Sequence, residues 1–166
     1  MYRKNGPQTP SPSTKILFVC HGNICRSTMA QSVFADMVAK QHMEHLFEID
    51  SAATSREEIG NTPHYGTVNK LRQVGIPLVP HRARQMTKQD YEYYDYLIGM
   101  DDYNIRNMQR IAGGDPDGKI YALLQFAGST RSIADPWYTG NFDETYDDVC
   151  EGLHAFLAYL QKESLI

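Results

Sequence analysis

Short apolar runs and longer amphipathic stretches alternate along the chain. Four runs of mostly apolar residues have the length and character of buried strands, and they cover residues 15–20, 47–52, 95–100 and 119–124. Elsewhere apolar side chains recur at helical spacing, in stretches that cover about residues 28–41, 63–74, 87–94, 101–111 and 142–162. Pro63 suits the first turn of its helix and Gly75 suits its end, whereas residues 134–138 are expected to form a loop.

This alternation predicts a single-domain α/β fold with one mostly parallel sheet. Parallel strands joined by helices are buried on both faces, so helices should cover both sides of the sheet. In such folds functional residues gather beyond the carboxyl ends of the strands. Cys20 is the last residue of the first predicted strand, which places it at that edge.

The composition fits one soluble domain. A chain of 166 residues with 42% hydrophobic and 22% charged residues can bury an adequate core without covalent or metal cross-links. Residues 1–13 are rich in Pro, Ser and Thr and are expected to form a flexible tail rather than a signal peptide, which leaves residues 14–166 as the domain. Apolar runs are too short for a membrane span.

The net charge limits the classes of binding partner, and the cysteine content indicates the cellular compartment. The formal net charge of −4 argues against sequence-independent nucleic-acid binding, which needs a basic field. If the chain binds an anionic ligand, a local positive pocket must attract it, because the protein as a whole is negatively charged. Three cysteines without a secretory signal indicate reduced thiols and a cytoplasmic location. Export by a route without a signal peptide stays open, and a monomer or weak dimer is expected.

The residues after the first strand carry the chemistry. The segment from Cys20 to Ser27 holds a cysteine and an arginine, Arg26, separated by five residues, and a predicted helix follows. The N–H groups of such a loop and the positive end of the helix can bind phosphate oxygens, and a guanidinium can clamp two of them. Gly22 permits the tight turn because glycine tolerates positive φ. The same groups favour a thiolate at Cys20, which can attack phosphorus.

Further residues complete this chemistry. Ser27 can hydrogen-bond the thiolate and ease its departure when water breaks a phosphocysteine. Asn23 lies mid-loop, where left-handed backbone conformations are expected and asparagine tolerates them. Asp135 can protonate the leaving oxygen as a general acid and then act as a base on water. Trp137 and Tyr138 would add aromatic surface at the pocket mouth, suited to an aryl ester.

Five stretches of the chain together resemble one known family. They are ILFVCHGNICRS at 16–27, DSAATS at 50–55, HRARQ at 81–85, MDDYN at 100–104 and DPWYTGNFDETYDDV at 135–149, and they bracket nearly the whole chain. The family is that of the low-molecular-weight protein tyrosine phosphatases. The resemblance implies a four-stranded parallel sheet in the order 2-1-3-4, with a phosphate-binding loop after the first strand. It also implies hydrolysis of phosphotyrosine in proteins through a phosphocysteine intermediate.

The resemblance assigns roles residue by residue. Cys20 matches the nucleophile, Arg26 the phosphate clamp and Asp135 the general acid. Cys25 matches a thiol that can form a protective, reversible disulfide with Cys20. The residues that match a hydrogen-bond network supporting the loop are Asn23, Ser27, Ser51 and His81. The residues expected at the phosphate or along the substrate are His21, Gly22, Asn23, Ile24, Cys25, Ser27, Glu57, Trp137 and Tyr138.

The chain departs from the family pattern at three positions. Thr28 stands where proline is usual, so the helix start is less preset, with little effect expected on the chemistry. His21 stands where Leu or Thr is common. Glu57 falls where some members carry an aromatic side chain at the pocket mouth. A carboxylate there would weaken stacking and repel anionic groups near the phosphotyrosine, so substrate preference should differ from those members.

Three alternative functions remain open on the residues. An arsenate reductase begins with a similar thiolate but needs resolving cysteines, and outside the loop the chain has only Cys150, on a predicted helix. A protein-arginine phosphatase is closer, although members with that activity carry threonine at the position of Ile24, whose side chain better suits an aryl ring. The third is an inactive phosphate-binding module. No cofactor or metal is expected, since Cys20, His21 and Cys25 fall short of the four ligands of a structural zinc site.

Overall fold

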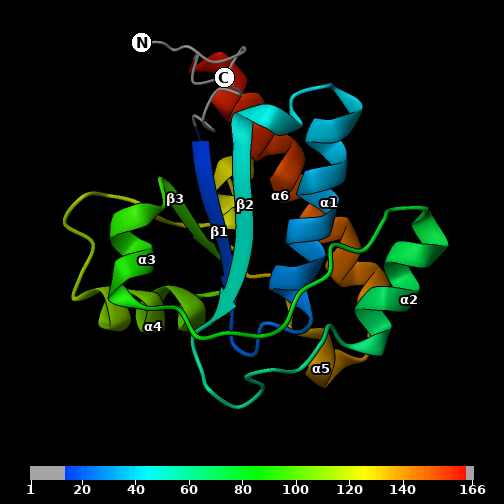
Figure 1. Cartoon of the computed structure of the whole chain (residues 1–166), viewed down its shortest axis with the longest axis horizontal. Helices are drawn as coiled ribbons and strands as arrows, with labels where there is room; N and C mark the ends of the chain where they lie inside the picture. The colour runs from blue at the N-terminus through cyan, green and yellow to red at the C-terminus, as the bar shows by residue number, and fades with distance from the viewer. Residues whose placement is uncertain (1–13, 164–166) are drawn as a thin grey trace, which may run out of the picture.

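The computed structural model describes residues 14–163 and is built around a four-stranded parallel sheet (Figure 1). The strands are β1 (Thr14–Cys20), β2 (Phe47–Ala53), β3 (Tyr96–Gly99) and β4 (Ile120–Ala122). Their order across the sheet is β2-β1-β3-β4, and each neighbouring pair runs parallel. This order confirms the predicted topology. The expected tail, residues 1–13, lies outside the described residues.

Strand β1 lies in the middle of the sheet because both of its faces are apolar. Ile16 and Phe18 belong to the core on one side of the sheet, and Leu17 and Val19 to the core on the other. Side chains alternate between the two faces along a strand, so one short run contributes to both cores. Cys20 ends the strand at the carboxyl edge of the sheet, where the functional site is predicted.

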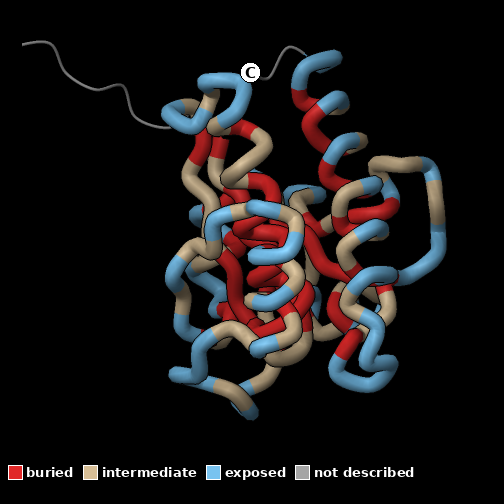
Figure 2. Tube along the Cα trace, turned by 90° about the vertical axis from the view of Figure 1, so that its right-hand side faces the viewer, coloured by how far each residue is buried: buried red, intermediate tan, exposed pale blue. Residues whose placement is uncertain are grey.

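Helices cover both faces of the sheet, as predicted (Figure 1). The helices of one face are α1 (Arg26–Lys40) and α6 (Phe142–Lys162), with α2 (Tyr65–Val74) packed against both. The helices of the other face are α3 (Lys88–Tyr93) and α4 (Asp102–Ala112). Phe34 of α1 joins the layers, with its ring centroid 5.5 Å from that of Phe156 in α6 and 5.3 Å from that of Phe47 in β2. Buried segments run through the centre of the molecule between these layers (Figure 2).

The start of α2 differs from the prediction. The sequence predicts Pro63 in the first turn, but the helix begins later, with His64 as its N-cap. The Nδ1 atom of His64 accepts a hydrogen bond from the backbone N–H of Gly66 at 3.0 Å, which satisfies one of the free donors of the first turn. The backbone N–H of His64 donates to the carbonyl oxygen of Ile24 at 2.8 Å. The helix start is thereby tied to the loop that follows β1.

The fourth strand is shorter than the sequence predicts. It ends at Ala122, and the chain continues as a 3₁₀ helix, η2 (Leu123–Ala127). Leu123 is fully buried against α6 at Gly152, where an added Cβ would lie only 2.5 Å from Leu123 Cγ. The packing of this leucine on the last helix therefore overrides the strand tendency of the apolar run. A second 3₁₀ helix, η1 (Glu44–Leu46), precedes β2.

A one-turn helix stands where the sequence predicts a loop over residues 134–138. It is α5 (Pro136–Thr139), and Asp135 is its N-cap. The Oδ1 atom of Asp135 accepts a hydrogen bond from the N–H of Trp137 at 3.0 Å. Pro136 takes the first helical position, where no N–H donor is needed. This cap fixes the position of the Asp135 carboxylate.

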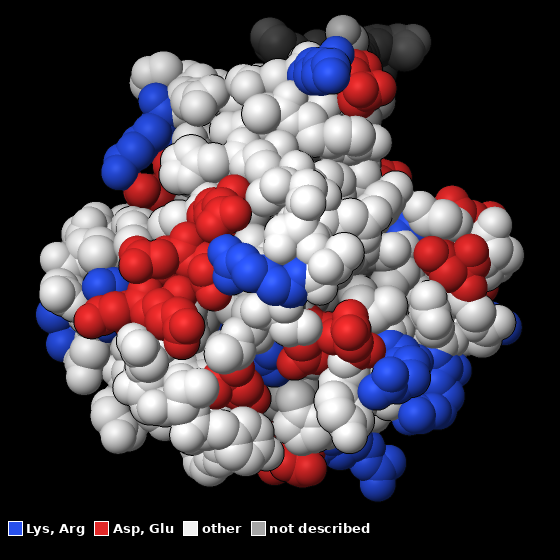
Figure 3. Space-filling view, turned by 180° about the vertical axis from the view of Figure 1, so that it is seen from behind, with Lys and Arg blue, Asp and Glu red and all other residues white. Residues whose placement is uncertain are grey.

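The surface shows no single dominant charge on the face seen from behind, where acidic and basic side chains form separate groups (Figure 3). Within residues 14–163, no helix has both the length and the apolar character needed to span a membrane. The same residues hold no cluster of three or more His, Cys, Asp or Glu side chains suited to a metal ion.

Candidate active site

The loop between β1 and α1 connects Cys20 to Arg26 at the carboxyl edge of the sheet. Asn23 in its middle has a left-handed backbone, with φ of 61°, as predicted, and is fully buried. Gly22 does not have the positive φ that the sequence suggests. Its importance is spatial instead, because an added Cβ would lie 3.3 Å from Glu58 Cγ.

The N-terminus of α1 is directed at this loop. Its N-cap residue, Cys25, makes no side-chain capping bond, which leaves backbone donors of the first turn for an anion. The N–H of Ser27 donates to Cys20 Sγ at 3.4 Å. Together with the helix dipole, this contact stabilises negative charge on the sulfur.

Buried hydrogen bonds support the loop from behind. The Nδ2 atom of Asn23 donates to Ser27 Oγ at 2.8 Å and to Ser51 Oγ at 2.9 Å. The Cys20 thiol donates to Ser27 Oγ at 3.1 Å. When Cys20 is a thiolate, the Ser27 hydroxyl can donate to the sulfur instead. Ser51 Oγ donates to Gln31 Oε1 at 2.5 Å, which adds a residue to the network that the resemblance implies.

His81 completes this network. Its Nε2 atom lies 2.7 Å from Asn23 Oδ1 and 3.2 Å from Ser51 Oγ. Burial lowers the pKa of His81 below its ordinary value; the Asp50 carboxylate, 3.5 Å from Nδ1, opposes this shift, and Arg84 adds to it. A neutral ring with its proton on Nε2 donates to Asn23 Oδ1 and so fixes the orientation of the amide.

Arg26 is buried beside the pocket and anchored through one terminal nitrogen. Nη1 donates to Asp101 Oδ2 at 2.6 Å and to the carbonyl oxygen of Ile133 at 2.8 Å. Nη2 lies 3.4 Å from Asp135 Oδ2, and Nε is buried without a hydrogen-bond partner among the described residues. The guanidinium edge formed by Nε and Nη2 is therefore the one suited to two phosphate oxygens.

Charges around Arg26 keep it ionised despite its burial. Burial alone would lower the pKa of Arg26, but Cys20 first, and then Asp101 and Asp135, raise it above its ordinary value. Arg26 therefore stays positively charged beside the pocket. Asp101 holds this charge in place, although only its position in the MDDYN stretch marks it in the sequence.

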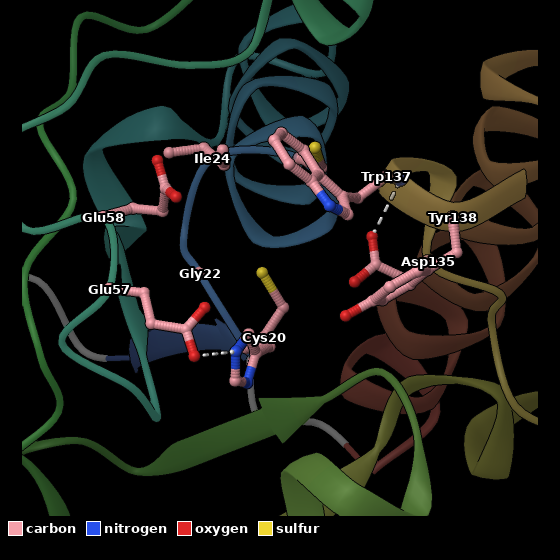
Figure 4. A pocket seen from close by; sticks show the side chains of 10 residues that line it. Cys20, Gly22, Ile24, Glu57, Glu58, Asp135, Trp137 and Tyr138 are labelled. Carbon is pink, nitrogen blue, oxygen red and sulfur yellow. Dashed lines mark hydrogen bonds and ion pairs between the residues drawn. The ribbon is translucent and has the colours of Figure 1, made fainter. Parts of the chain in front are cut away.

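A pocket opens above Cys20 (Figure 4). Trp137 and Tyr138 lie on the same side as Asp135, and Glu57 and Glu58 lie across from them. The residues that line the pocket are Cys20, His21, Gly22, Ile24, Cys25, Glu57, Glu58, Asp135, Trp137 and Tyr138. Of the residues predicted to contact phosphate or substrate, Asn23, Arg26 and Ser27 do not line this pocket, whereas Glu58, which was not predicted, does.

Cys25 lines this pocket as a buried thiol. Burial, and second the charge of Cys20, raise the pKa of Cys25 to about 12, so the Cys25 side chain is protonated near neutral pH. Both cysteines are free in the structure. The disulfide between them stays a prediction.

Sequence reasoning missed Asp101, Gln31 and Glu58. Gln31 lies one helical turn after Ser27, and that spacing is the signal that could have placed it behind the loop. Asp101 directly follows Met100, the last residue of a predicted strand, and so lies at the expected edge. Glu58 lies in an irregular segment whose path cannot be derived from periodicity.

The fold and these contacts define a class of enzyme, the phosphatases that use a cysteine nucleophile on a phosphate-binding loop. The required parts are a thiol at the end of a central strand, a helix N-terminus, a buried arginine and a carboxylate over the pocket. Comparison with known proteins makes the assignment specific. The chain belongs to the low molecular weight phosphotyrosine protein phosphatase family, whose model matches residues 15–165. This confirms the predicted family and the predicted class of activity, protein-tyrosine phosphatase.

Similar proteins cover nearly the whole chain. The low molecular weight protein-tyrosine-phosphatase YfkJ of Bacillus subtilis is 41% identical over 150 residues, which are 89% of this chain and 96% of that protein. The crystal structure of YfkJ matches with a TM-score of 0.87 at 40% identity, covering 94% of this chain and 99% of that one. The low molecular weight phosphotyrosine protein phosphatase of Homo sapiens is 38% identical over 149 residues, 86% of this chain and 92% of that protein.

An arginine phosphatase shares the fold. The crystal structure of the Drosophila arginine phosphatase DARP matches with a TM-score of 0.80 at 28% identity, covering 88% of this chain and 97% of that one. The same architecture is therefore found in proteins named for different phosphorylated residues.

Proposed function

We propose that this chain removes phosphate from phosphotyrosine side chains through a phosphocysteine formed at Cys20. The observation that carries the proposal is the position of Cys20 Sγ in the pocket at the N-terminus of α1, with the buried Arg26 guanidinium beside that pocket. Asp135 lines the same pocket, with Oδ2 3.4 Å from Arg26 Nη2, and supplies the remaining group. The scheme needs no metal, since Arg26 and backbone N–H groups provide the positive charge.

The first step transfers the phosphoryl group to sulfur. Loop N–H groups and the Nε and Nη2 atoms of Arg26 bind the nonbridging oxygens. The Cys20 thiolate then forms a bond to phosphorus while the bond from phosphorus to the tyrosine oxygen breaks. Asp101 keeps Nη1 of Arg26 engaged at 2.6 Å, so the guanidinium needs little rearrangement during the reaction.

Asp135 is the proposed general acid for the leaving oxygen. Its Oδ1 atom accepts from the Trp137 N–H at 3.0 Å, and its Oδ2 atom lies 3.4 Å from Arg26 Nη2. A bound phosphate would take over Nη2 and leave Asp135 Oδ2 free to face the leaving oxygen. In the proposed step, Asp135 gives a proton to the tyrosine oxygen as the ester bond breaks.

Hydrolysis of the phosphocysteine reverses these roles. Water attacks phosphorus, Asp135 takes a proton from the water, and the electron pair of the breaking bond returns to Cys20 sulfur. The Ser27 hydroxyl at 3.1 Å and the Ser27 N–H at 3.4 Å stabilise the departing thiolate. Phosphate is released and the enzyme returns to its starting state.

Substitution of Cys20 tests the nucleophile. Cys20→Ser should abolish turnover of phosphotyrosine peptides, while binding of inorganic phosphate, measured by calorimetry, persists because Arg26 and the loop remain. Activity of the unaltered enzyme should survive EDTA. Turnover by Cys20→Ser at the rate of the unaltered enzyme would refute the proposal.

The apolar wall of the pocket favours an aryl substrate over phosphoarginine. Ile24 lines the pocket, with Trp137 and Tyr138 nearby, and these side chains suit the ring of phosphotyrosine better than a guanidinium. Matched phosphotyrosine and phosphoarginine peptides should give the higher kcat/KM for phosphotyrosine, and Ile24→Thr should reduce that ratio. A clear preference of the unaltered enzyme for phosphoarginine would contradict this assignment.

Reversible oxidation is proposed for the same loop. A peroxide would oxidise Cys20 to a sulfenic acid, and the Cys25 thiol would displace water from it to form a disulfide. Without the Cys25 thiol, excess peroxide oxidises the sulfenic acid further to a sulfinic acid that dithiothreitol does not reduce, so Cys25→Ala should recover less activity than the unaltered enzyme after prolonged peroxide treatment. Equal recovery by both proteins would exclude the disulfide.

The remaining proposals concern assembly and location. We expect the chain to act on phosphotyrosine-containing proteins in the cytoplasm as a monomer or weak dimer. Light scattering across a concentration series should give a mass between those of monomer and dimer. A stable higher oligomer would contradict this expectation.

A further inference from the structure

Carboxylates line the pocket from two sides. Glu57 and Glu58 approach from the segment after β2, and Asp135 approaches from the opposite side (Figure 4). Among the residues that line the pocket, His21 is the only one with a basic side chain. A substrate phosphate therefore passes an acidic entrance before it reaches Arg26.

Glu57 is held at this entrance and stays accessible. Its Oε2 atom lies 3.2 Å from His21 Nε2, and the side chains of His21 and Glu57 are 44% and 68% exposed. The backbone N–H of Glu57 donates to Ser55 Oγ at 3.4 Å. The carboxylate can therefore contact a group of the substrate outside the phosphotyrosine ring.

Glu58 is placed by the phosphate-binding loop itself. Its aliphatic stem lies over Gly22, where an added Cβ would be 3.3 Å from Glu58 Cγ. Its Oε1 atom accepts a hydrogen bond from Asn61 Nδ2 at 2.9 Å. These contacts hold a second carboxylate beside Glu57 at the pocket wall.

The segment that carries both glutamates is fixed to the active-site loop by backbone hydrogen bonds. The N–H of Thr54 donates to the carbonyl oxygen of Cys20 at 2.9 Å, and the N–H of Ser55 donates to that of His21 at 3.1 Å. Beyond the glutamates, the N–H of Gly60 donates to the carbonyl oxygen of Ala83 at 2.8 Å. The two carboxylates therefore have set positions relative to the nucleophile.

We propose that Glu57 and Glu58 make the enzyme selective for phosphotyrosine sites with a lysine or arginine within two residues of the phosphotyrosine. The proposal rests on the proposed function and specifies its substrate class. A flanking cation gains Coulomb attraction at the rim, and a flanking Asp or Glu meets repulsion. We assign this selectivity to the two glutamates and not to Asp135. Asp135 accepts a hydrogen bond from the Trp137 N–H and serves as the proposed general acid.

Paired peptides test this selectivity. Three phosphotyrosine peptides would differ only in the residues beside the phosphotyrosine, which are lysine, glutamine or glutamate. At low ionic strength the kcat/KM for the lysine peptide should exceed that for the glutamate peptide by on the order of tenfold, which corresponds to two partly screened charge contacts. Added salt should reduce this ratio, because exposed charges are screened.

Charge-neutral variants assign the effect to residues. The double variant Glu57→Gln with Glu58→Gln should reduce the lysine-to-glutamate ratio to about one, since the carboxylates are removed at nearly constant size. Each single variant should give a lysine-to-glutamate ratio between those of the double variant and the unaltered enzyme. Glu92→Gln removes the same charge from an exposed position of α3 and should keep the full ratio. Using the ratio within one protein cancels any change in overall activity.

Two results would overturn the proposal. One is a lysine-to-glutamate ratio near one for the unaltered enzyme, and the other is an undiminished ratio in the double variant. The glutamine peptide separates this failure from failure of the proposed function. If that peptide is hydrolysed without any charge preference among the three, only the selectivity is refuted. If none of the three is hydrolysed, phosphotyrosine hydrolysis itself is refuted.

Discussion

Asp101 uses its two carboxylate oxygens for two different contacts. Oδ1 accepts from the backbone N–H of Asn104 at 2.7 Å and caps α4, while Oδ2 accepts from Arg26 Nη1 at 2.6 Å. A residue of the scaffold thereby sets the direction of the guanidinium. The free edge of Arg26, formed by Nε and Nη2, depends on this contact.

The substitution Asp101→Asn should remove the negative charge beside Arg26 while keeping the N-cap of α4. Asparagine caps helices about as well as aspartate, so α4 should keep its start. The charge-assisted hydrogen bond to Arg26 is lost, which should lower kcat/KM for phosphotyrosine peptides by roughly thirtyfold, or about 2 kcal/mol. Asp102→Asn, at the exposed first position of the same helix, is the control. Equal kcat/KM for the Asp101 and Asp102 variants would show that Asp101 does not position Arg26.

His81 should make folding stability depend on pH. In the unfolded chain histidine has a pKa of about 6.5, and burial lowers the pKa of His81 in the folded protein. The unfolded state therefore binds this proton more readily. The contribution of the neutral His81 ring to the free energy of unfolding is fully present above about pH 6.5. It declines as the pH falls toward the lower pKa that His81 has in the folded protein.

Urea unfolding between pH 5 and pH 8 measures this effect. His81→Gln should flatten the loss of unfolding free energy at the acidic end, because the titrating ring is gone. His45→Gln, at an exposed position of η1, should leave the profile unchanged. A His81→Gln profile as steep as that of the unaltered protein would rule out His81 as the source.

At the scale of elements, the sequence predicts those that have a clear period or cap. The last helix is found with its predicted bounds, Phe142–Lys162, because one apolar face continues through all of it. The 119–124 run fails as a strand beyond Ala122, since its leucines pack on a distant helix. The short helix after Asp135 fails to appear in the prediction because a single capped turn has no period to detect. The local sequence pattern therefore determines the last helix, whereas tertiary contacts determine where the fourth strand ends.

The contact between η2 and α6 should be sensitive to one added methyl group. In an open helix position Gly→Ala stabilises by about 1 kcal/mol, but at Gly152 the new Cβ would lie 2.5 Å from Leu123 Cγ. Gly152→Ala should therefore destabilise the protein by about 1–3 kcal/mol in urea unfolding. In a Leu123→Ala background the same substitution should cost little or be favourable. Equal cost in both backgrounds would contradict the packing described.

For the whole molecule, the predicted strand order indicates the edge of the sheet at which the site lies. The residue types that phosphoryl transfer needs indicate most of the residues proposed for the site. Cys20 is placed by the end of β1, and Arg26 by its spacing from Cys20. Asp135 is distant in sequence and is identified by resemblance rather than by periodicity. Asp101 and Glu58 become functional only through neighbours that the fold supplies, Arg26 and Gly22. Pairings of this kind depend on tertiary structure, so no local pattern contains them.

Acid trapping of the covalent intermediate tests directly whether Cys20 carries the phosphoryl group. The enzyme would be mixed with a phosphotyrosine peptide, quenched in acid within milliseconds, digested and analysed by mass spectrometry. We expect one phosphoryl group on Cys20 and none on the equivalent peptide of Cys20→Ala, whose turnover should also be lost. Slower hydrolysis in Asp135→Ala should not prevent detection of the phosphocysteine. Turnover by the unaltered enzyme with the phosphoryl group on another residue, or continued turnover by Cys20→Ala, would contradict the account.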